Sequence, residues 1–142
     1  MHFDTPTQII SNLSLVLVCA YALWRGQSVE RWGAVLTFAD WTLTPLVQDL
    51  SHLHGAQLEI FAVDAAYVLG LSVLALRSDR FWPLWAAAFM ILEVIMHVAM
   101  LVDHQVRARA YFIGMEIWSY LSLIPLGVGA AVEAPRRGPS PS

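Results

Sequence analysis

The sequence predicts an all-α membrane protein, a polytopic bundle of five transmembrane helices, and three observations lead to this fold class. Of the 142 residues, 58% are hydrophobic and only 13% are charged, whereas globular proteins carry about 25% charged residues. The apolar residues fall into five runs, most of which have the roughly 17–25 residues that cross a bilayer as a helix. The links between the runs are short, which favours antiparallel packing of neighbouring helices.

The first predicted span covers about residues 7–24, and the residues before it include no Arg or Lys. We therefore expect it to be retained in the membrane rather than cleaved as a secretory signal. It contains Cys19, the chain's only cysteine, so no intrachain disulfide can form. The second span, about 32–47, is short, and we expect Pro45 to distort or end it.

The other three predicted spans cover about residues 58–76, 81–102 and 110–132. Gly127 and Gly129 in the last span indicate close helix packing. Residues 1–133 then form a single transmembrane domain. Residues 134–142 are rich in Pro, Ser and Gly, and we expect them to form a disordered cytoplasmic tail.

Basic and aromatic residues orient the predicted bundle. With five spans, six of the eight arginines fall on one side, which the positive-inside rule assigns to the cytoplasm. The N-terminus then faces the periplasm of a bacterial inner membrane. Trp residues gather at the same ends as the arginines, which is typical of an interfacial belt. The expected cytoplasmic anchors are Trp24, Arg25, Arg31, Trp32, Arg77, Arg80, Trp82 and Trp85.

Ionisable residues within the spans gather in the half nearer the periplasm. A charged side chain at the bilayer centre costs at least about 2.5–3.5 kcal/mol, so we expect these residues to face inward and to line one polar cavity. The buried polar cluster predicted in this way consists of Asp40, Asp64, Glu93, His97, Glu116 and Tyr120.

Helical spacing supports this prediction in three of the spans, and in the last of them Glu116 and Tyr120 lie four residues apart. Glu93, His97 and His104 lie within roughly 40° of one another on a helix. Thr37, Asp40, Thr44 and Gln48 form a second stripe in the second span.

Three kinds of chemistry are compatible with these residues. The first is a hydrogen-bonded network that joins the helices, and the second is a chain of protonatable groups that carries protons or binds a cation. The third is a bound metal ion, or a tetrapyrrole ligated by His97. The candidate metal ligands are Glu93, His97, His104, His52 and His54.

Three segments and one residue carry a resemblance to a known group of proteins. The stretches YALWRGQSVERWGA and LRSDRFWPLWAAAF, followed by His97 and IWSYLSL, resemble uncharacterised small multi-span membrane proteins of alphaproteobacteria. The resemblance covers most of the chain and implies a membrane location but no activity.

The sequence therefore predicts an integral inner-membrane protein that is not an enzyme. We expect an accessory protein or complex subunit with a polar carboxylate and histidine cavity in its periplasmic half; a proton or cation pathway, or a metal or pigment site, is the alternative. The expected partners are the lipid bilayer and another membrane protein or a second copy of the chain. A net charge of -3 argues against a nucleic-acid partner.

Overall fold

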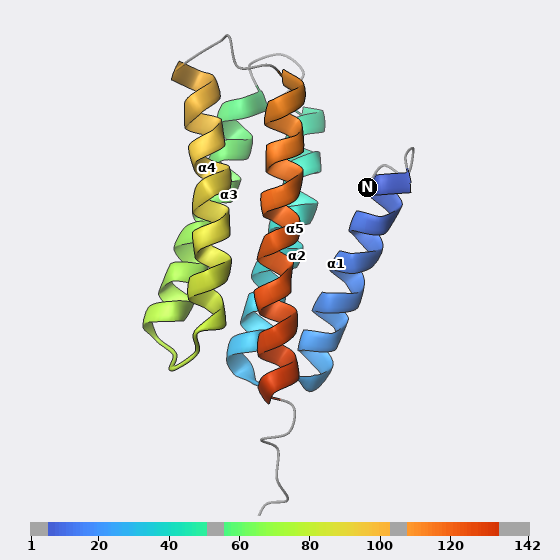
Figure 1. Cartoon of the computed structure of the whole chain (residues 1–142), viewed down its shortest axis with the longest axis vertical. Helices are drawn as coiled ribbons and strands as arrows, with labels where there is room; N and C mark the ends of the chain where they lie inside the picture. Colours follow the sequence, from blue (N-terminus) through green and yellow to red (C-terminus); the bar gives the residue numbers. More distant parts are fainter. Residues whose placement is uncertain (1–5, 51–55, 103–107, 134–142) are drawn as a thin grey trace, which may run out of the picture.

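The fold is a bundle of five helices in the part of the chain that the computed structural model describes, residues 6–50, 56–102 and 108–133 (Figure 1). No strand occurs in these residues, so the predicted all-α class is confirmed. The helices are α1 (Pro6–Arg25), α2 (Ser28–Leu50), α3 (Ala56–Leu76), α4 (Trp82–Val102) and α5 (Ala108–Glu133).

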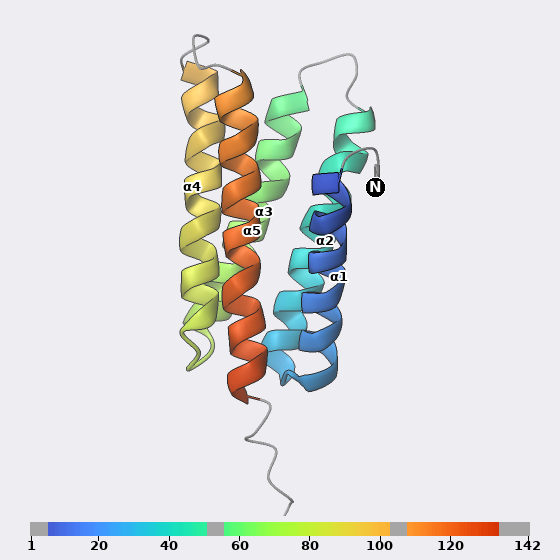
Figure 2. The same cartoon turned by 45° about the vertical axis from the view of Figure 1, so that its right-hand side comes forward.

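The helices form a closed ring in which consecutive helices are antiparallel, and the ring is closed by α5 and α1, which run parallel to each other (Figures 1 and 2). Each packs against its successor, α5 packs back against α1, and α2 also contacts α5. Figures 1 and 2 show α1 beginning at the same end of the bundle at which α2 and α4 finish. We call this the upper end, and we call the end that carries the α1–α2 and α3–α4 links the lower end.

The α1–α2 link is tight because its polar groups are satisfied locally. The Gly26 N–H donates to the carbonyl of Ala22 at 2.9 Å, and the Gln27 N–H donates to the Glu30 carboxylate at 2.9 Å. A carboxylate three residues into a helix that accepts from the preceding backbone N–H is half of a capping box. A Cβ at position 26 would lie 2.4 Å from the Ala22 oxygen, so the turn requires glycine.

Pro45 is expected to distort or end α2, and the structure contradicts the second of these alternatives. The helix continues to Leu50, with Pro45 inside it. Proline removes one backbone donor from the helix. Close to this position, the Thr44 hydroxyl donates to the carbonyl of Asp40 at 2.9 Å. A neighbouring threonine of this kind helps a helix in a membrane protein to accommodate proline.

Three helices are long and apolar enough to cross a membrane, over Leu58–Leu76, Trp82–Met100 and Ile113–Val132. In the described part of α1 the apolar stretch is shorter, Ile9–Arg25, and α2 is interrupted by polar residues. Large apolar side chains are exposed on the outside of the bundle, among them Leu17, Leu69, Ile95 and Ile124. These features indicate a membrane protein.

The core contains both large and small apolar side chains. The largest fully buried ones are Leu15, Leu71, Met90 and Leu126. Alanines are buried towards the lower end of four helices, at Ala22, Ala34, Ala86 and Ala130. The helices therefore approach closely at the lower end, and the polar side chains described next lie above this region.

Candidate functional site: an acidic cavity in the upper half

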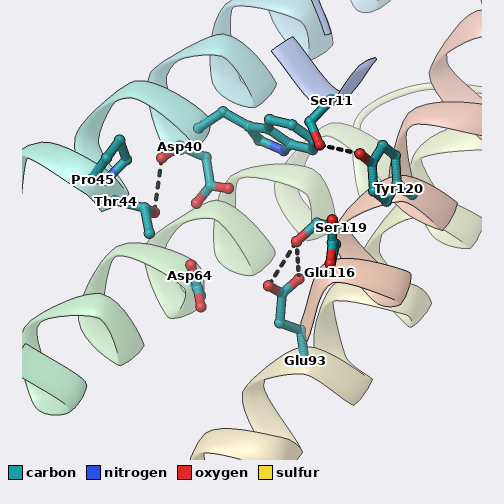
Figure 3. Close-up of a pocket in the computed structure, with 10 residues that line it drawn as sticks. Ser11, Asp40, Thr44, Pro45, Asp64, Glu93, Glu116, Ser119 and Tyr120 are labelled. Atoms are coloured by element: carbon teal, nitrogen blue, oxygen red, sulfur yellow. Dashed lines mark hydrogen bonds between the residues drawn. The ribbon is translucent and has the colours of Figure 1, made fainter. Parts of the chain in front are cut away.

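A cavity of about 200 Å³ lies in the upper half of the bundle. All helices contribute to its wall, which consists of Ser11, Asp40, Trp41, Thr44, Pro45, Asp64, Glu93, Glu116, Ser119 and Tyr120. Four of these residues carry a carboxyl group and none is basic. Figure 3 shows the carboxyl groups of Asp40, Asp64 and Glu93 pointing toward the same space from three different helices.

One oxygen of the Asp40 carboxyl accepts no hydrogen bond from the described protein. Its side chain is only 7% exposed, and its Oδ1 has no hydrogen-bond partner in the described protein. A buried polar atom that lacks a partner costs about 1–3 kcal/mol. A ligand that donates a hydrogen bond here would remove that cost.

Asp64 is held by His97 from the neighbouring helix. The Nε2 of His97 lies 2.7 Å from Oδ2 of Asp64, and both side chains are buried. The ring of Phe61 meets the imidazole edge-on at 6.2 Å between centroids, which helps to fix the ring plane. His97 does not line the cavity. It orients a carboxyl that does.

Glu93 is connected to α5 through Ser119. The Ser119 hydroxyl lies 2.8 Å and 3.0 Å from the two carboxylate oxygens of Glu93. One hydroxyl proton can satisfy only one acceptor at a time, so the Glu93 carboxyl retains capacity to accept from a ligand.

Tyr120 joins the first and last helices across the side of the cavity. Its hydroxyl forms a hydrogen bond with the Ser11 hydroxyl (Figure 3). Its ring also meets Trp41 of α2 edge-on, with centroids 6.0 Å apart and planes at 77°. Two aromatic side chains therefore stand beside the carboxyl groups.

A second polar contact lies one helical turn below Asp40 and Asp64. The Thr37 hydroxyl is 2.7 Å from the Tyr67 hydroxyl and 2.8 Å from the carbonyl of Gly33. Both side chains are buried, and neither lines the cavity. The two hydroxyls bond to each other, and the Thr37 hydroxyl also bonds to the backbone. This contact therefore closes the space below the carboxyls, and neither hydroxyl is left without a hydrogen-bond partner.

Glu30 and Trp82 form a separate buried pair near the lower end, which the sequence interpretation missed. Glu30 is 0% exposed and accepts a hydrogen bond of 3.0 Å from the Trp82 indole nitrogen. The sequence interpretation assigned Glu30 to a link and Trp82 to an interfacial anchor. The sequence signal for Glu30 is weak, because a capping box has Ser or Thr three residues before the Glu and this chain has Gln27 there.

Trp82 therefore differs from the other predicted anchors. It is 7% exposed and sits against Gly33 and Gly129, because glycines on α2 and α5 leave room for the indole. The other Trp anchors are exposed: Trp24 at 71%, Trp32 at 62% and Trp85 at 61%.

Among the arginines, Arg25 lies over the ring of Trp24 at 5.4 Å, and Arg25, Arg31 and Arg77 are exposed.

The structure brings most of the predicted polar cluster to one place. Asp40, Asp64, Glu93 and Tyr120 surround the cavity, and Glu116 also lines it but is exposed. Ser119 and Trp41 also line the cavity, but the pattern of polar residues in the sequence did not predict them.

The predicted metal ligands are only partly described. His52, His54 and His104 lie outside the described residues, as does the side chain of Gln48. Within the described ranges, no three His, Cys, Asp or Glu side chains are grouped so that they could hold a metal ion.

Comparison with known proteins gives no match to a protein-family model, a curated protein or a solved structure.

Proposed function

We propose that this chain is a five-span protein of a bacterial inner membrane, with its N-terminus in the periplasm and its C-terminus in the cytoplasm. Three apolar helices, and the antiparallel packing of each helix against the next along the chain, support five crossings. The exposed arginines and tryptophans near the lower end support a cytoplasmic lower end. The resemblance to alphaproteobacterial membrane proteins agrees with this location and stays a prediction.

Surface labelling tests the orientation. In a Cys19→Ala background, Glu59→Cys near the upper end should react in intact cells with a maleimide that does not cross the inner membrane. Ser28→Cys at the lower end should react only after the cells are broken. The reverse pattern, or labelling of both positions in intact cells, would contradict the proposed topology.

We propose that the upper cavity binds a small cation and that the protein is not an enzyme. The observation that carries this proposal is the meeting of carboxyls from α2, α3, α4 and α5 around a space that no basic residue lines, with Oδ1 of Asp40 unpaired. Ionisable groups inside a membrane bundle face partners or a cavity because lipid cannot solvate them. A cation is the ligand that complements such a wall.

The packing below the cavity favours binding over conduction. The Thr37–Tyr67 contact lies directly below the carboxyls, and under it Leu126, Ala34 and Trp82 belong to one apolar cluster. A cation then enters and leaves through the upper side. This arrangement suits an accessory or sensing subunit.

Ligand-dependent stability tests cation binding. Unfolding of the purified protein in an uncharged detergent is followed with increasing Na⁺ at constant ionic strength. At 100 times its Kd, a bound cation raises the unfolding free energy by about 2.7 kcal/mol. Asp40→Asn should abolish this increase, whereas Asp79→Asn, an exposed control at the lower end, should preserve it. If neither Na⁺ nor any other small cation stabilises the wild type, the proposal is wrong.

A proton or cation pathway through the membrane is the second candidate function. It is favoured by the buried polar face of α2, where Glu30, Thr37 and Asp40 follow one another from the lower end upward. In proteoliposomes it predicts a flux that Glu93→Gln removes. Flux that Glu93→Gln leaves unchanged would exclude this pathway.

Binding of a metal ion or a tetrapyrrole is a further proposal, and one set of measurements tests it. The cavity of about 200 Å³ is smaller than the roughly 300–1,000 Å³ of most ligand pockets, which argues against a large pigment. Elemental analysis together with an absorption spectrum of the purified protein tests both ligands. Less than about a tenth of a metal per chain would exclude a tight site.

The expected protein partner is tested by purification in a mild detergent. A stoichiometric membrane-protein partner or a stable self-associated form would support an accessory role. A lone monomer that binds neither a protein nor a cation would contradict it.

A further inference from the structure

We infer that the cavity ligand is a primary alkylammonium ion of about five or six non-hydrogen atoms. This inference rests on the cation-binding function proposed above and names the class of cation. Three features of the wall carry it: an unpaired buried acceptor, two aromatic side chains and the size of the space.

Carboxyl oxygens in the cavity wall can accept further hydrogen bonds, which favours a cation with several N–H donors. Oδ1 of Asp40 has no partner, and the Glu93 carboxylate shares one Ser119 hydroxyl between both oxygens. A primary ammonium carries three N–H donors and no acceptor. It can therefore donate to both carboxyls at once, which a quaternary ammonium cannot.

The apolar part of the wall calls for a cation with a hydrocarbon portion. Trp41, Tyr120 and Pro45 line the same cavity as the carboxyls. Aromatic rings attract ammonium groups and at the same time bury alkyl carbons. A hydrated inorganic cation would gain little from these three side chains.

The size of the space limits the ligand. At about 30 Å³ for each water-sized unit, a volume of about 200 Å³ accommodates roughly six such units. This matches a short alkylamine. The described residues also offer no three-ligand group for a metal ion, so the wall is better matched to hydrogen bonding than to metal coordination.

Isothermal titration calorimetry of the purified protein in an uncharged detergent tests the ligand class. The probes are n-butylammonium, tetramethylammonium and Na⁺. We expect n-butylammonium to bind at least about tenfold more tightly than the other two, since charge-assisted hydrogen bonds supply about 10- to 150-fold in affinity. Equal or tighter binding of tetramethylammonium would overturn the role assigned to the N–H donors.

Paired variants locate the site. Asp40→Asn should weaken the binding of n-butylammonium at least about tenfold, and Asp79→Asn should have no effect.

Trp41→Leu should weaken the binding of n-butylammonium by about 2- to 30-fold. Its affinity for Na⁺ should be retained, which would show that the variant is folded. Trp32→Leu, on the exposed part of the same helix, is its control. Binding that Asp40→Asn and Trp41→Leu leave unchanged would overturn the inference.

The titration separates failure of this inference from failure of the proposed function. If Na⁺ binds in an Asp40-dependent manner and n-butylammonium does not, the ammonium assignment is wrong and cation binding stands. If none of the three probes binds, the ammonium assignment is wrong, and the proposed function is wrong as well when no other small cation stabilises the protein.

Discussion

Trp82 lies in a tightly packed slot between Gly33 and Gly129, and Gly129→Ala is the change that probes this packing. A Cβ at position 129 would lie 2.4 Å from Cδ1 and 2.6 Å from Cγ of Trp82. These atoms are at the rigid base of the indole and cannot swing away alone. On the opposite side, a Cβ at Gly33 would lie 2.2 Å from Cη2 of the same ring, so the indole cannot shift toward α2.

The expected cost is the difference between two destabilising contributions and one stabilising contribution. Alanine in place of glycine in a helix ordinarily stabilises by up to about 1 kcal/mol. Overpacking costs about 1–3 kcal/mol, and displacement of Trp82 from Glu30 adds about 1–3 kcal/mol for the lost hydrogen bond in a buried place. We therefore expect Gly129→Ala to lower the free energy of unfolding by about 2–4 kcal/mol.

Gly127→Ala is the matched control on the same helix. Its Cβ would meet only Cγ1 of Val18 at 3.8 Å, an ordinary contact, so its unfolding free energy should stay the same or rise by up to about 1 kcal/mol. Unfolding in detergent, followed by tryptophan fluorescence, compares the two variants. Gly129→Ala that is as stable as Gly127→Ala would refute the argument. In a Trp82→Ala background the cost of Gly129→Ala should disappear.

Three further substitutions test the buried polar contacts, each by the same unfolding measurement. Glu30→Ala should destabilise by about 2–4 kcal/mol because two donors lose their acceptor, and Glu30→Gln, which retains an acceptor, should cost less. Asp64→Ala should cost about 3 kcal/mol because it leaves the buried His97 without its carboxyl partner. Tyr67→Phe should cost about 1 kcal/mol because Thr37 keeps its bond to the backbone.

Exposed residues of the same types provide the controls for these substitutions. Glu59→Ala, Asp79→Ala and Tyr21→Phe change side chains that are exposed, and each should stay within about 0.5 kcal/mol of the wild type. A buried variant that behaves like its control would show that the corresponding contact contributes nothing to stability.

The helices themselves could be predicted because their signal is local. Each apolar run in the sequence corresponds to one helix, with boundaries that differ by a few residues. The largest difference is at α2, which begins at Ser28 rather than near residue 32. The sequence interpretation read Gln27 to Glu30 as a link, whereas the Glu30 side chain caps the helix and extends it by a turn.

The polar cavity could be anticipated only in part. Depth in the membrane and helical spacing selected Asp40, Asp64, Glu93 and Tyr120. Neither signal pairs residues on different helices, so the contact of His97 with Asp64, 33 positions away, required the packing of α3 against α4.

The Trp82 slot could not be predicted because three helices create it together. Gly33 on α2 and Gly129 on α5 are far apart in the sequence, and each appears ordinary by itself. Only their approach to the same indole explains why this tryptophan is interior while its neighbour Trp85 is exposed.

The closure of the ring by α5 against α1 has a consequence for how the protein is made. Ser11 and Tyr120 are 109 positions apart, so at roughly 5–20 residues per second the ribosome needs about 5–22 s to supply the partner of Ser11. During that interval Asp40 and Asp64 are already synthesised, but the last wall of their enclosure is still missing. We therefore expect chains that stop before α5 to leave these carboxyls without their last enclosing helix and to be less stable in a membrane than the complete chain.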